Sequence, residues 1–352
     1  MSGALLGRAG VDFLPFVTVI MPVRNERAHI GRSVAAILLQ DYPADRLEVI
    51  VVDGTSADGT RDIVANMAIR NPHATIRILD NPGCIVPTGL NVALRVAQGD
   101  IIVRVDGHTI IAPDYVRQCV TELQRTGADN VGGKMNASGQ GAFGATVTLA
   151  TSAPFGVGNA RFHYSNQEEW VDTVYMGAWS HEVFRRVGLF DEELVRNQDD
   201  EFNYRLLKHG GRILLSPYIR SQYTVRGTPS SLWRQYLQYG YWKVRVLQKH
   251  PGQMRLRQFA PPLFVAILIG TAALAPFTTI GQILMALIGG AYLVTNLIAS
   301  LWTARQCGWR HLPLLPFVFA ILHVSYGLGF LMGLVRFWNR WGDKVGKTPT
   351  WQ

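Results

Sequence analysis

The chain has 352 residues, of which 48% are hydrophobic and only 17% charged, so it is apolar for a soluble protein. Its net charge of +9 hides an asymmetry, because residues 1–201 carry 24 acidic and 17 basic side chains, whereas residues 202–258 carry 11 basic and no acidic ones. A basic block can bind nucleic acid, but this one adjoins a long apolar run. That favours anionic lipid head groups or a phosphorylated lipid as partners and excludes nucleic acid.

Two features of the chain bear on its compartment. The first eight residues, MSGALLGR, lack the basic start and long apolar run of a cleaved signal peptide, so we expect the N-terminal domain to stay in the cytoplasm. The cysteines Cys84, Cys119 and Cys307 are far apart and in no metal-ligand spacing, which fits a reducing compartment without a disulfide framework.

Apolar strands alternate with amphipathic helices over the first hundred residues. The pattern predicts strands at residues 16–23, 47–54, 75–80 and 100–106, and helices at residues 24–40, 58–69 and 88–99. This order is typical of a doubly wound α/β sheet, which binds ligands beyond the carboxyl ends of its strands. Three polar groups follow such strand ends and should share one crevice: Pro22–Glu26, Asp53 and Asp106–His108.

The middle of the chain has less regular patterns. A helix is predicted at residues 114–125, and the glycine-rich stretch Asn130–Gly144 is interpreted as a strand and a mobile loop, because it lacks the Gly-Lys-Ser/Thr ending of a P-loop. Residues 197–215 have the pattern of a capped helix that ends at two glycines and is followed by a strand. At residues 232–248, aromatic side chains lie among arginines and lysines, as on an amphipathic helix in a bilayer interface.

Three apolar stretches follow, at residues 259–277, 280–302 and 313–335, each close to the roughly 20 residues of a spanning helix. Basic residues before the first stretch and at Arg305 and Arg310 favour two spans, because a third would carry the basic C-terminus outside. Alternatively, Gly327 and Gly329 break the third stretch into a re-entrant hairpin. We expect a multi-pass inner-membrane protein with about three membrane segments, divided into a cytoplasmic domain (1–230), an interfacial helix (231–258), the membrane segments (259–335) and a basic tail (336–352).

Five sequence motifs occur in order: VIMPVRNE, IVVDGTSADGT, GLNVALRVAQGDIIVRVDGH, MGAWSHEVFRRVGLFDEEL and QDDEFNYRLLKHGG. Over residues 15–250 they resemble the membrane-bound inverting glycosyltransferases of family 2, which have a GT-A fold with a mixed α/β sheet. The Asp-Gly-His triplet and the trailing apolar segments resemble the succinoglycan-biosynthesis glucosyltransferase group of bacterial exopolysaccharide assembly. The resemblance implies inverting transfer of one sugar from a UDP-sugar or GDP-sugar to a polyprenyl-linked glycan, alongside other proteins of a polysaccharide pathway.

The Asp-Gly-His triplet is the predicted metal site. Asp106 and His108 point to the same side of an extended triplet, and Gly107 lets the backbone approach a nucleotide. A divalent cation that bridges two phosphates helps the diphosphate to leave. The family usually has Asp-x-Asp here, and imidazole suits Mn²⁺ better than Mg²⁺, so we expect Mn²⁺, or else Mg²⁺, as the cofactor.

The resemblance also assigns the donor pocket. It places Pro22, Val23, Asn25 and Glu26 around the nucleoside, and Asp53 as acceptor of a hydrogen bond from the base. Asn91 would also face the nucleotide, although a solvated helix position fits it equally well. An ordinary helix start and turn are the alternative interpretation of the first motif and of Asp53.

The second acidic cluster is the predicted catalytic centre. Inverting transfer needs a base for the acceptor hydroxyl, and alignment to the family places it on Asp199, with Asp200 as the rival after a slip of one residue. Three acids in the first turn of a helix are also favoured by the helix dipole alone.

The segment QYGYWK, residues 238–243, stands where processive relatives carry Gln-x-x-Arg-Trp, and the match is only partial. Trp242 is predicted to stack on the acceptor sugar, and Lys243 or Arg245 to neutralise the departing diphosphate, with Gly177 nearby; the alternative is an interfacial aromatic belt. The partial match argues against a polymerising synthase. Two other functions stay open: a polyprenyl-phosphate glycosyltransferase and a non-catalytic membrane scaffold.

Overall fold

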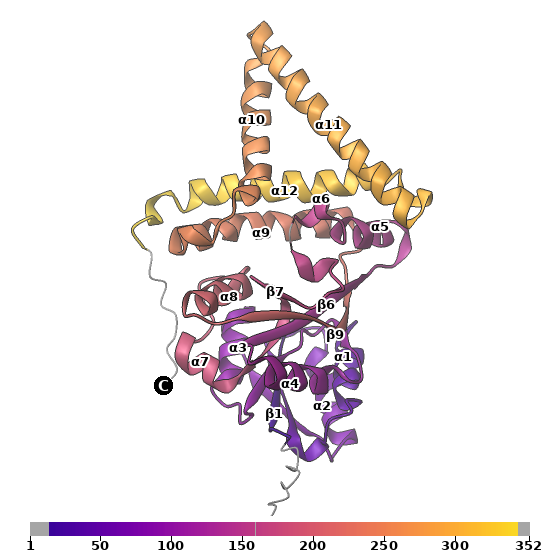
Figure 1. Ribbon diagram of the computed structural model, residues 1–352, viewed down its shortest axis with the longest axis vertical. Coiled ribbons are helices and arrows are strands. Elements are labelled where there is room, and N and C mark those ends of the chain that lie inside the picture. Colours follow the sequence, from indigo (N-terminus) through magenta and orange to yellow (C-terminus); the bar gives the residue numbers. More distant parts are fainter. Residues whose placement is uncertain (1–13, 159, 344–352) are drawn as a thin grey trace, which may run out of the picture.

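The computed structural model describes residues 14–158 and 160–343 (Figure 1). The prediction that no signal peptide is present falls on residues 1–13 and lies outside the described residues, as does most of the predicted basic tail.

A mixed sheet forms the centre of the N-terminal domain, with strand order β3-β2-β1-β4-β8-β6-β9-β5 and β7 paired to β9 in the described chain. Neighbours β3, β2, β1 and β4 are parallel, β8 runs antiparallel to β4 and β6, and β9 runs parallel to β6. The bounds are β1 Val17–Val23, β2 Leu47–Asp53, β3 Thr75–Asp80, β4 Ile101–Arg104, β5 Thr109–Ile111, β6 Asn130–Ser138, β7 Glu169–Val171, β8 Tyr175–Ser180 and β9 Ile213–Thr224.

Helices cover both faces of this sheet because its central strands are apolar on both sides. Helices α1 (Ile30–Leu38), α2 (Thr60–Arg70) and α4 (Tyr115–Thr126) pack on one face, and α3 (Val86–Leu94), α7 (His181–Val187) and α8 (Gln198–Lys208) on the other. The register pairs Val23 of β1 with Asp53 of β2, so the carboxyl ends of these strands lie together. The predicted doubly wound mixed sheet is confirmed.

Two local predictions are wrong. The predicted helix at 24–40 begins only at Ile30, because the preceding residues form a loop in which Asn25 has a positive φ of 54°. The predicted mobile loop after β6 contains helix α5 (Gly141–Thr151), followed by the short α6 (Pro154–Val157). Val147 and Ala150 of α5 pack against apolar residues of the C-terminal part, which explains why a glycine-rich stretch becomes helical.

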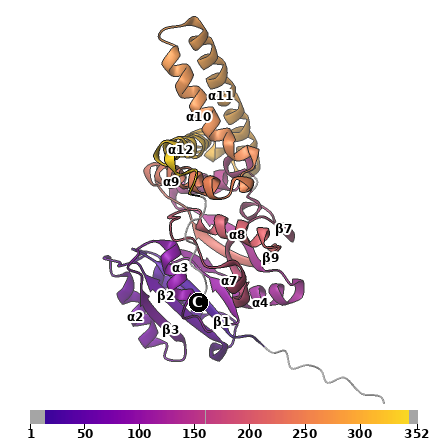
Figure 2. The ribbon, with the colours of Figure 1, turned by 90° about the vertical axis from the view of Figure 1, so that its left-hand side faces the viewer.

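The two helices α9 (Pro229–Lys249) and α12 (Leu315–Arg336) lie side by side (Figures 1 and 2). A Cβ atom at Gly240 would lie 2.0 Å from the Tyr326 carbonyl oxygen, and one at Gly329 would lie 2.0 Å from the Leu237 oxygen. Glycine is therefore needed where the two backbones touch. The alternative in which Gly327 and Gly329 break the third apolar stretch is wrong, because α12 is continuous.

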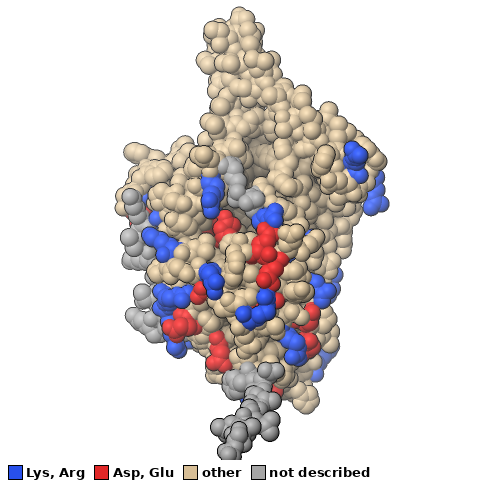
Figure 3. Space-filling view, viewed as in Figure 1, with Lys and Arg blue, Asp and Glu red and all other residues tan. Residues whose placement is uncertain are grey.

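Helices α10 (Ala260–Leu274) and α11 (Thr279–Cys307) form a hairpin that projects away from the domain (Figures 1 and 2). Helix α12 does not join it but runs crosswise along its base. In the described chain α11 and α12 are long and apolar enough to cross a membrane, whereas α10 has only 15 residues. The space-filling view shows charges of both signs over the domain and none on the projecting upper part of the hairpin (Figure 3). Arg305 lies in the last turn of α11, at the base of the hairpin.

Several basic side chains of α9 point into the N-terminal domain. Lys243, Arg245 and Lys249 are buried and form ion pairs with acidic residues of the domain, namely Asp200, Glu193 and Asp191. For Lys243 and Arg245, the interfacial position predicted for residues 232–248 is therefore wrong, since both side chains face the domain. Helix α9 lies between the domain and α12 (Figure 1).

Candidate active site

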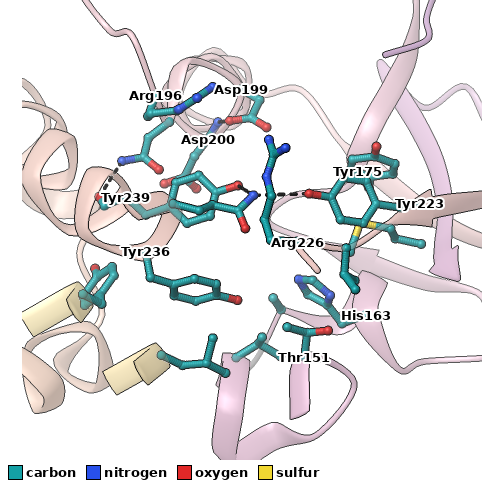
Figure 4. Close-up of a pocket in the computed structure, with 18 of the residues that line it drawn as sticks. Thr151, His163, Tyr175, Arg196, Asp199, Asp200, Tyr223, Arg226, Tyr236 and Tyr239 are labelled. Carbon is teal, nitrogen blue, oxygen red and sulfur yellow. Dashed lines mark hydrogen bonds between the residues drawn. The ribbon is translucent and has the colours of Figure 1, made fainter. Parts of the chain in front are cut away.

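A cavity of about 1460 Å³ begins at the carboxyl end of β1 and reaches the base of the hairpin. Figure 4 shows its middle part, with Asp199 and Asp200 on one side and Tyr175 and Tyr223 on another. Most of the predicted site residues line this cavity: Pro22, Val23, Asn25, Glu26, Asp106, Gly107, His108, Asp199, Asp200 and Lys243.

The loop after β1 is held rigidly against the loop after β2. Asn25 adopts the left-handed conformation that asparagine tolerates better than most residues. Its backbone N–H donates to Ser56 Oγ at 2.9 Å, and its Oδ1 accepts from the Ala57 N–H at 3.0 Å. The N–H of Glu26 donates to Thr60 Oγ1 at 2.8 Å. These bonds fix one wall of the cavity before any ligand arrives.

Asp53 lies just behind this wall and does not line the cavity itself, whereas its neighbour Gly54 does. The side chain is 4% exposed, and its Oδ2 accepts a hydrogen bond from the Ser56 N–H at 3.2 Å. Its Oδ1 is buried and has no hydrogen-bond partner among the described residues. The buried carboxylate therefore holds the loop after β2 in place through the Ser56 N–H.

The turn between β4 and β5 presents Asp106 and His108. Arg104, buried in β4, donates from Nε to Asp106 Oδ1 at 2.8 Å. His108 Nδ1 lies 3.0 Å from Glu26 Oε1. A Cβ atom at Gly107 would lie 2.9 Å from Val23 Cγ1, so this glycine permits close packing of the turn on the β1 loop.

Asp106 and His108 fit a metal that is shared between protein and substrate. The contact with Glu26 uses Nδ1 of His108 and leaves Nε2 for a metal, an arrangement in which the carboxylate orients the ring. In the described chain no group of three or more His, Cys, Asp or Glu side chains could hold a metal alone. The remaining ligands would have to be substrate phosphates and water, as is common for Mg²⁺.

The three acids at the start of α8 have different surroundings. Asp200 pairs with Lys243, and Glu201 is buried between Arg205, at 2.5 Å, and His250, at 2.9 Å. Asp199 lines the cavity and has no ion pair with another described residue. Burial raises the pKa of the Asp199 carboxyl; Asp200 and Asp106 raise it further, and Arg104 opposes the change.

Several cavity residues escaped the sequence analysis. Gln235 Nε2 donates to the hydroxyl groups of Tyr223 and Tyr239, both at 3.2 Å. Arg226 projects into the cavity and makes no hydrogen bond or ion pair with another described residue (Figure 4). His163 has a buried Nδ1 without a partner, and burial lowers the pKa of this imidazole to about 4, so the ring is neutral at pH 7.

Arg104 also lines the cavity and was also missed, although it left a signal in the sequence. A cation inside the apolar run IIVRV predicts a buried partner, and that partner is Asp106. Arg226 and His163 lie in segments without any pattern, so their place in the cavity follows from the tertiary fold alone.

Besides Asp53, four predicted site residues do not line the cavity, and the structure corrects their roles. Asn91 is 1% exposed and bonds to the backbone of Phe190, so it does not face the nucleotide. Gly177 has a φ of 105°, in a strand where a Cβ atom would lie 2.5 Å from the Trp179 ring. Trp242 packs on Tyr241 and Phe337, and Arg245 is fully buried against Glu193.

A mixed α/β sheet of this order, with acidic residues beyond the carboxyl ends of its central strands, is the architecture of GT-A glycosyltransferases. Residues 18–192 match the family model named Glycosyl transferase family 2. The chain therefore contains a glycosyl transferase family 2 domain, as the five sequence motifs predict.

Three comparisons extend over most of the chain. The succinoglycan biosynthesis protein ExoA of Rhizobium meliloti is 28% identical over 324 residues, covering 92% of this chain and 96% of that protein. A protein of Methanococcus voltae, the dolichyl N-acetyl-alpha-D-glucosaminyl phosphate 3-beta-D-2,3-diacetamido-2,3-dideoxy-beta-D-glucuronosyltransferase, is 26% identical over 329 residues, 91% of this chain and 98% of its own. The mannosyltransferase PcManGT of Pyrobaculum calidifontis, in complex with GDP-Man and Mn²⁺, shares the fold with a TM-score of 0.60 at 22% identity, covering 91% and 88% of the two chains.

Proposed function

We propose that this protein is an inverting glycosyltransferase that moves one sugar from a nucleoside diphosphate sugar to a lipid-linked glycan at the cytoplasmic face of the membrane. Its product would serve exopolysaccharide or cell-surface glycan synthesis. The observation that carries the proposal is the position of Asp199, which faces the same cavity as Asp106 and His108 and forms no ion pair with any residue that the structure describes.

The donor would occupy the end of the cavity next to β1 and β2. The fixed loop at Asn25 would hold the nucleoside, and Asp53, behind this wall, would keep the adjoining loop in place through the Ser56 N–H. Asp106 and His108 would hold a divalent cation, Mn²⁺ or Mg²⁺, which stabilises negative charge on a departing diphosphate. Glu26 keeps the His108 ring oriented, and Arg104 keeps the Asp106 carboxylate in place.

The acceptor hydroxyl would be deprotonated by Asp199. Because burial raises the pKa of Asp199, its ionised form is a better proton acceptor than an exposed carboxylate. Asp200 is a weaker candidate, since its charge is already balanced by Lys243. Arg226 projects into the cavity, forms no hydrogen bond or ion pair within residues 14–158 and 160–343, and would bind a phosphate group of donor or acceptor.

Donor turnover is the direct test. Protein in lipid nanodiscs would be given UDP-sugars and GDP-sugars one at a time with Mn²⁺, and release of the nucleoside diphosphate would be recorded. The proposal expects one or a few donors to be turned over and Asp106→Ala to abolish turnover. If none of the donors releases diphosphate above the rate of the Asp106→Ala variant, the protein is not the enzyme proposed here.

A polyprenyl-phosphate glycosyltransferase is the second candidate, because an unpartnered arginine in the cavity also suits a phosphate as the attacking group. The product separates the two reactions. Transfer to a lipid phosphate gives an acid-labile sugar phosphate, whereas transfer to a glycan gives an acid-stable bond between two sugars.

We further propose that the α10–α11 hairpin enters the bilayer while α9 and α12 lie along its surface. Helix α10 rises about 22 Å, less than the roughly 30 Å hydrocarbon core. A complete crossing therefore also requires the residues on either side of α10 to lie in the bilayer. A hairpin leaves the domain and the residues after α12 on the same side, which satisfies the positive-inside rule.

Cysteine labelling tests this topology in a background without the native cysteines. An impermeant reagent added outside spheroplasts should label a cysteine at Thr279, at the tip of the hairpin, and spare one at Gly342, after α12. Labelling of Gly342→Cys from outside would show that α12 crosses the membrane and would refute the proposed arrangement.

A further inference from the structure

The segment that leads into α8 is fastened to α9. Three contacts join them: Arg196 Nε donates to Gln238 Oε1 at 3.1 Å, Asn197 Nδ2 donates to the Tyr239 carbonyl oxygen at 3.0 Å, and Asp200 forms an ion pair with Lys243. The partners on α9 all belong to the stretch QYGYWK, residues 238–243, where the sequence predicted contacts with acceptor and diphosphate. This part of α9 therefore binds a loop of the protein itself.

Asn197 determines how α8 begins. It has a φ of 63° and a ψ of 20°, the left-handed conformation, directly before the first residue of the helix. Its carbonyl oxygen accepts a helical hydrogen bond from the Glu201 N–H at 3.0 Å. An asparagine at this position commonly caps its own helix with the side chain, but Asn197 makes no such bond. Its amide reaches the backbone of α9 instead, so one residue sets both the start of α8 and its attachment to α9.

Asp199 has few contacts of its own. In the described chain its carboxylate accepts a hydrogen bond from the neighbouring Asp200 N–H at 2.9 Å and forms no ion pair. Its place in the cavity therefore depends on where the first turn of α8 lies. Figure 4 shows Arg196, Asp199 and Asp200 close together near Tyr239.

The part of α9 under this loop is itself well supported. Gly240 lets α9 touch α12, since a Cβ atom there would lie 2.0 Å from the Tyr326 carbonyl oxygen. Further along α9, the buried Arg245 pairs with Glu193, which lies in the segment before Asn197. The two hydrogen bonds of Arg196 and Asn197 thus connect the start of α8 to a fixed surface.

We propose that Asn197 is a positioning residue for the catalytic base and that Gln238 and Tyr239 of α9 form the support on which the base is held. The inference rests on the proposed function, because it takes Asp199 as the base. A misplacement of about 1 Å can lower a rate on the order of 10²-fold. Loss of the Asn197 contact should therefore affect the reaction more than it affects the fold.

Glycine at position 197 separates the side chain from the backbone conformation. Asn197→Gly permits the left-handed conformation and removes only the amide. The assay would use a sugar nucleotide that the protein turns over, with Mn²⁺ in nanodiscs and water as the acceptor. Release of the nucleoside diphosphate should fall about 10- to 10²-fold in kcat, whereas the KM for the donor should stay within about twofold.

Asn71→Gly is the matched control for stability. Asn71 Nδ2 also donates to a backbone carbonyl oxygen, that of Met67 at 2.8 Å, but at the end of α2 and outside the cavity. This variant should keep the kcat of the wild-type protein, and the thermal midpoint of Asn197→Gly should fall no further than that of Asn71→Gly. A fall in kcat that is equal in the two variants would overturn the inference.

A double variant shows whether Asn197 acts through Asp199. Asn197→Gly should lower kcat in the wild-type protein but not in Asp199→Asn, because the carboxylate that it positions is then absent. Equal losses in both backgrounds would overturn the inference, as would a higher KM for the donor with an unchanged kcat.

Gln238 provides a second test, because it lies outside the cavity and contacts Arg196 rather than the space for substrate. Gln238→Leu should lower kcat as Asn197→Gly does. Gln238→Glu should restore it, since a carboxylate also accepts a hydrogen bond from Arg196 Nε. The same kcat in the leucine and glutamate variants would contradict the supporting role of Gln238.

Hydrogen exchange measures the attachment without any reaction. Backbone amides in the first two turns of α8 should exchange faster in Asn197→Gly than in the wild-type protein, and equal exchange would overturn the inference. Turnover separates this inference from the proposed function. If the wild-type protein turns over none of the donors, the proposed function is rejected, whereas turnover with equal losses in both backgrounds rejects only the positioning role of Asn197.

Discussion

Asp199 and Asp200 are adjacent, yet their isosteric replacements should have opposite consequences. Asp199→Asn removes the only carboxylate of this helix start that faces the cavity without a cation in the described chain, so transfer should be lost while the fold is kept. Asp200→Asn weakens an ion pair with Lys243, so the fold should be destabilised while much of the transfer is kept.

The magnitudes follow from the surroundings of each residue. A positioned general base contributes about 10²–10⁴-fold, so Asp199→Asn should raise the barrier by about 3 to 5 kcal/mol. Breaking a fully buried ion pair costs about 3 to 5 kcal/mol. The Asp200 side chain is 30% exposed and that of Lys243 6%, so solvent lowers this cost to about 1 to 3 kcal/mol.

The assay measures three quantities on each variant: transfer rate, donor affinity and thermal midpoint. Asp199→Asn should keep the donor affinity within about twofold, because its carboxylate would act on the acceptor. Adding Lys243→Met to Asp200→Asn should recover part of the lost stability, because the unpaired buried cation is then removed. If Asp199→Asn retains transfer and Asp200→Asn abolishes it without loss of stability, the base has been assigned to the wrong carboxylate.

Three further outcomes are expected. The transfer rate should fall as the pH drops through the raised pKa of Asp199, at a higher pH than for an ordinary carboxyl. In Arg104→Met this fall should occur at a still higher pH, because the positive charge that lowers the pKa of Asp199 is removed. An unchanged pH profile of this variant would contradict the assignment. Gly240→Ala should lower the thermal midpoint by several degrees, since its Cβ would lie 2.0 Å from a backbone oxygen of α12, whereas Gly289→Ala, which meets nothing within 4 Å, should not. His108→Asp restores the Asp-x-Asp pattern and should raise the ratio of Mg²⁺-supported to Mn²⁺-supported donor turnover; an unchanged ratio would show that His108 does not touch the metal.

The sequence was most informative where a local pattern decides the structure. Strands β1 and β2 could be predicted because short apolar runs rich in β-branched residues, such as VTVI and EVIVV, are typical of buried strands. The turn at Asp106–His108 was predictable for the same reason, since polar residues directly after such a strand must lie at the edge of the sheet.

Partners that are distant in the chain were not predictable. Lys243 lies in the stretch predicted to be interfacial, but the acid that binds it precedes it by 43 residues and comes from the domain. The partner of Lys249, Asp191, precedes it by 58 residues. Asn91 and Arg245 resemble ligand-binding residues by type and position, and only the fold shows that Phe190 and Glu193 already use their polar groups. Type and spacing thus identify the residues that can do chemistry, whereas tertiary contacts decide which of them are free to do it.

Helix α9 connects α12 to the candidate active site. Lys243 belongs to α9, whose backbone touches that of α12 at Gly240 and Gly329, and its ammonium group forms an ion pair with Asp200, next to the proposed base. Any movement of α12 on the membrane surface would therefore shift α9 and with it the charge beside Asp199. Because the cavity also reaches the base of the hairpin, residues of α10, α11 and α12 line the same space as Asp199 and Asp200, so in the proposed arrangement transfer to the acceptor should depend on an intact hairpin.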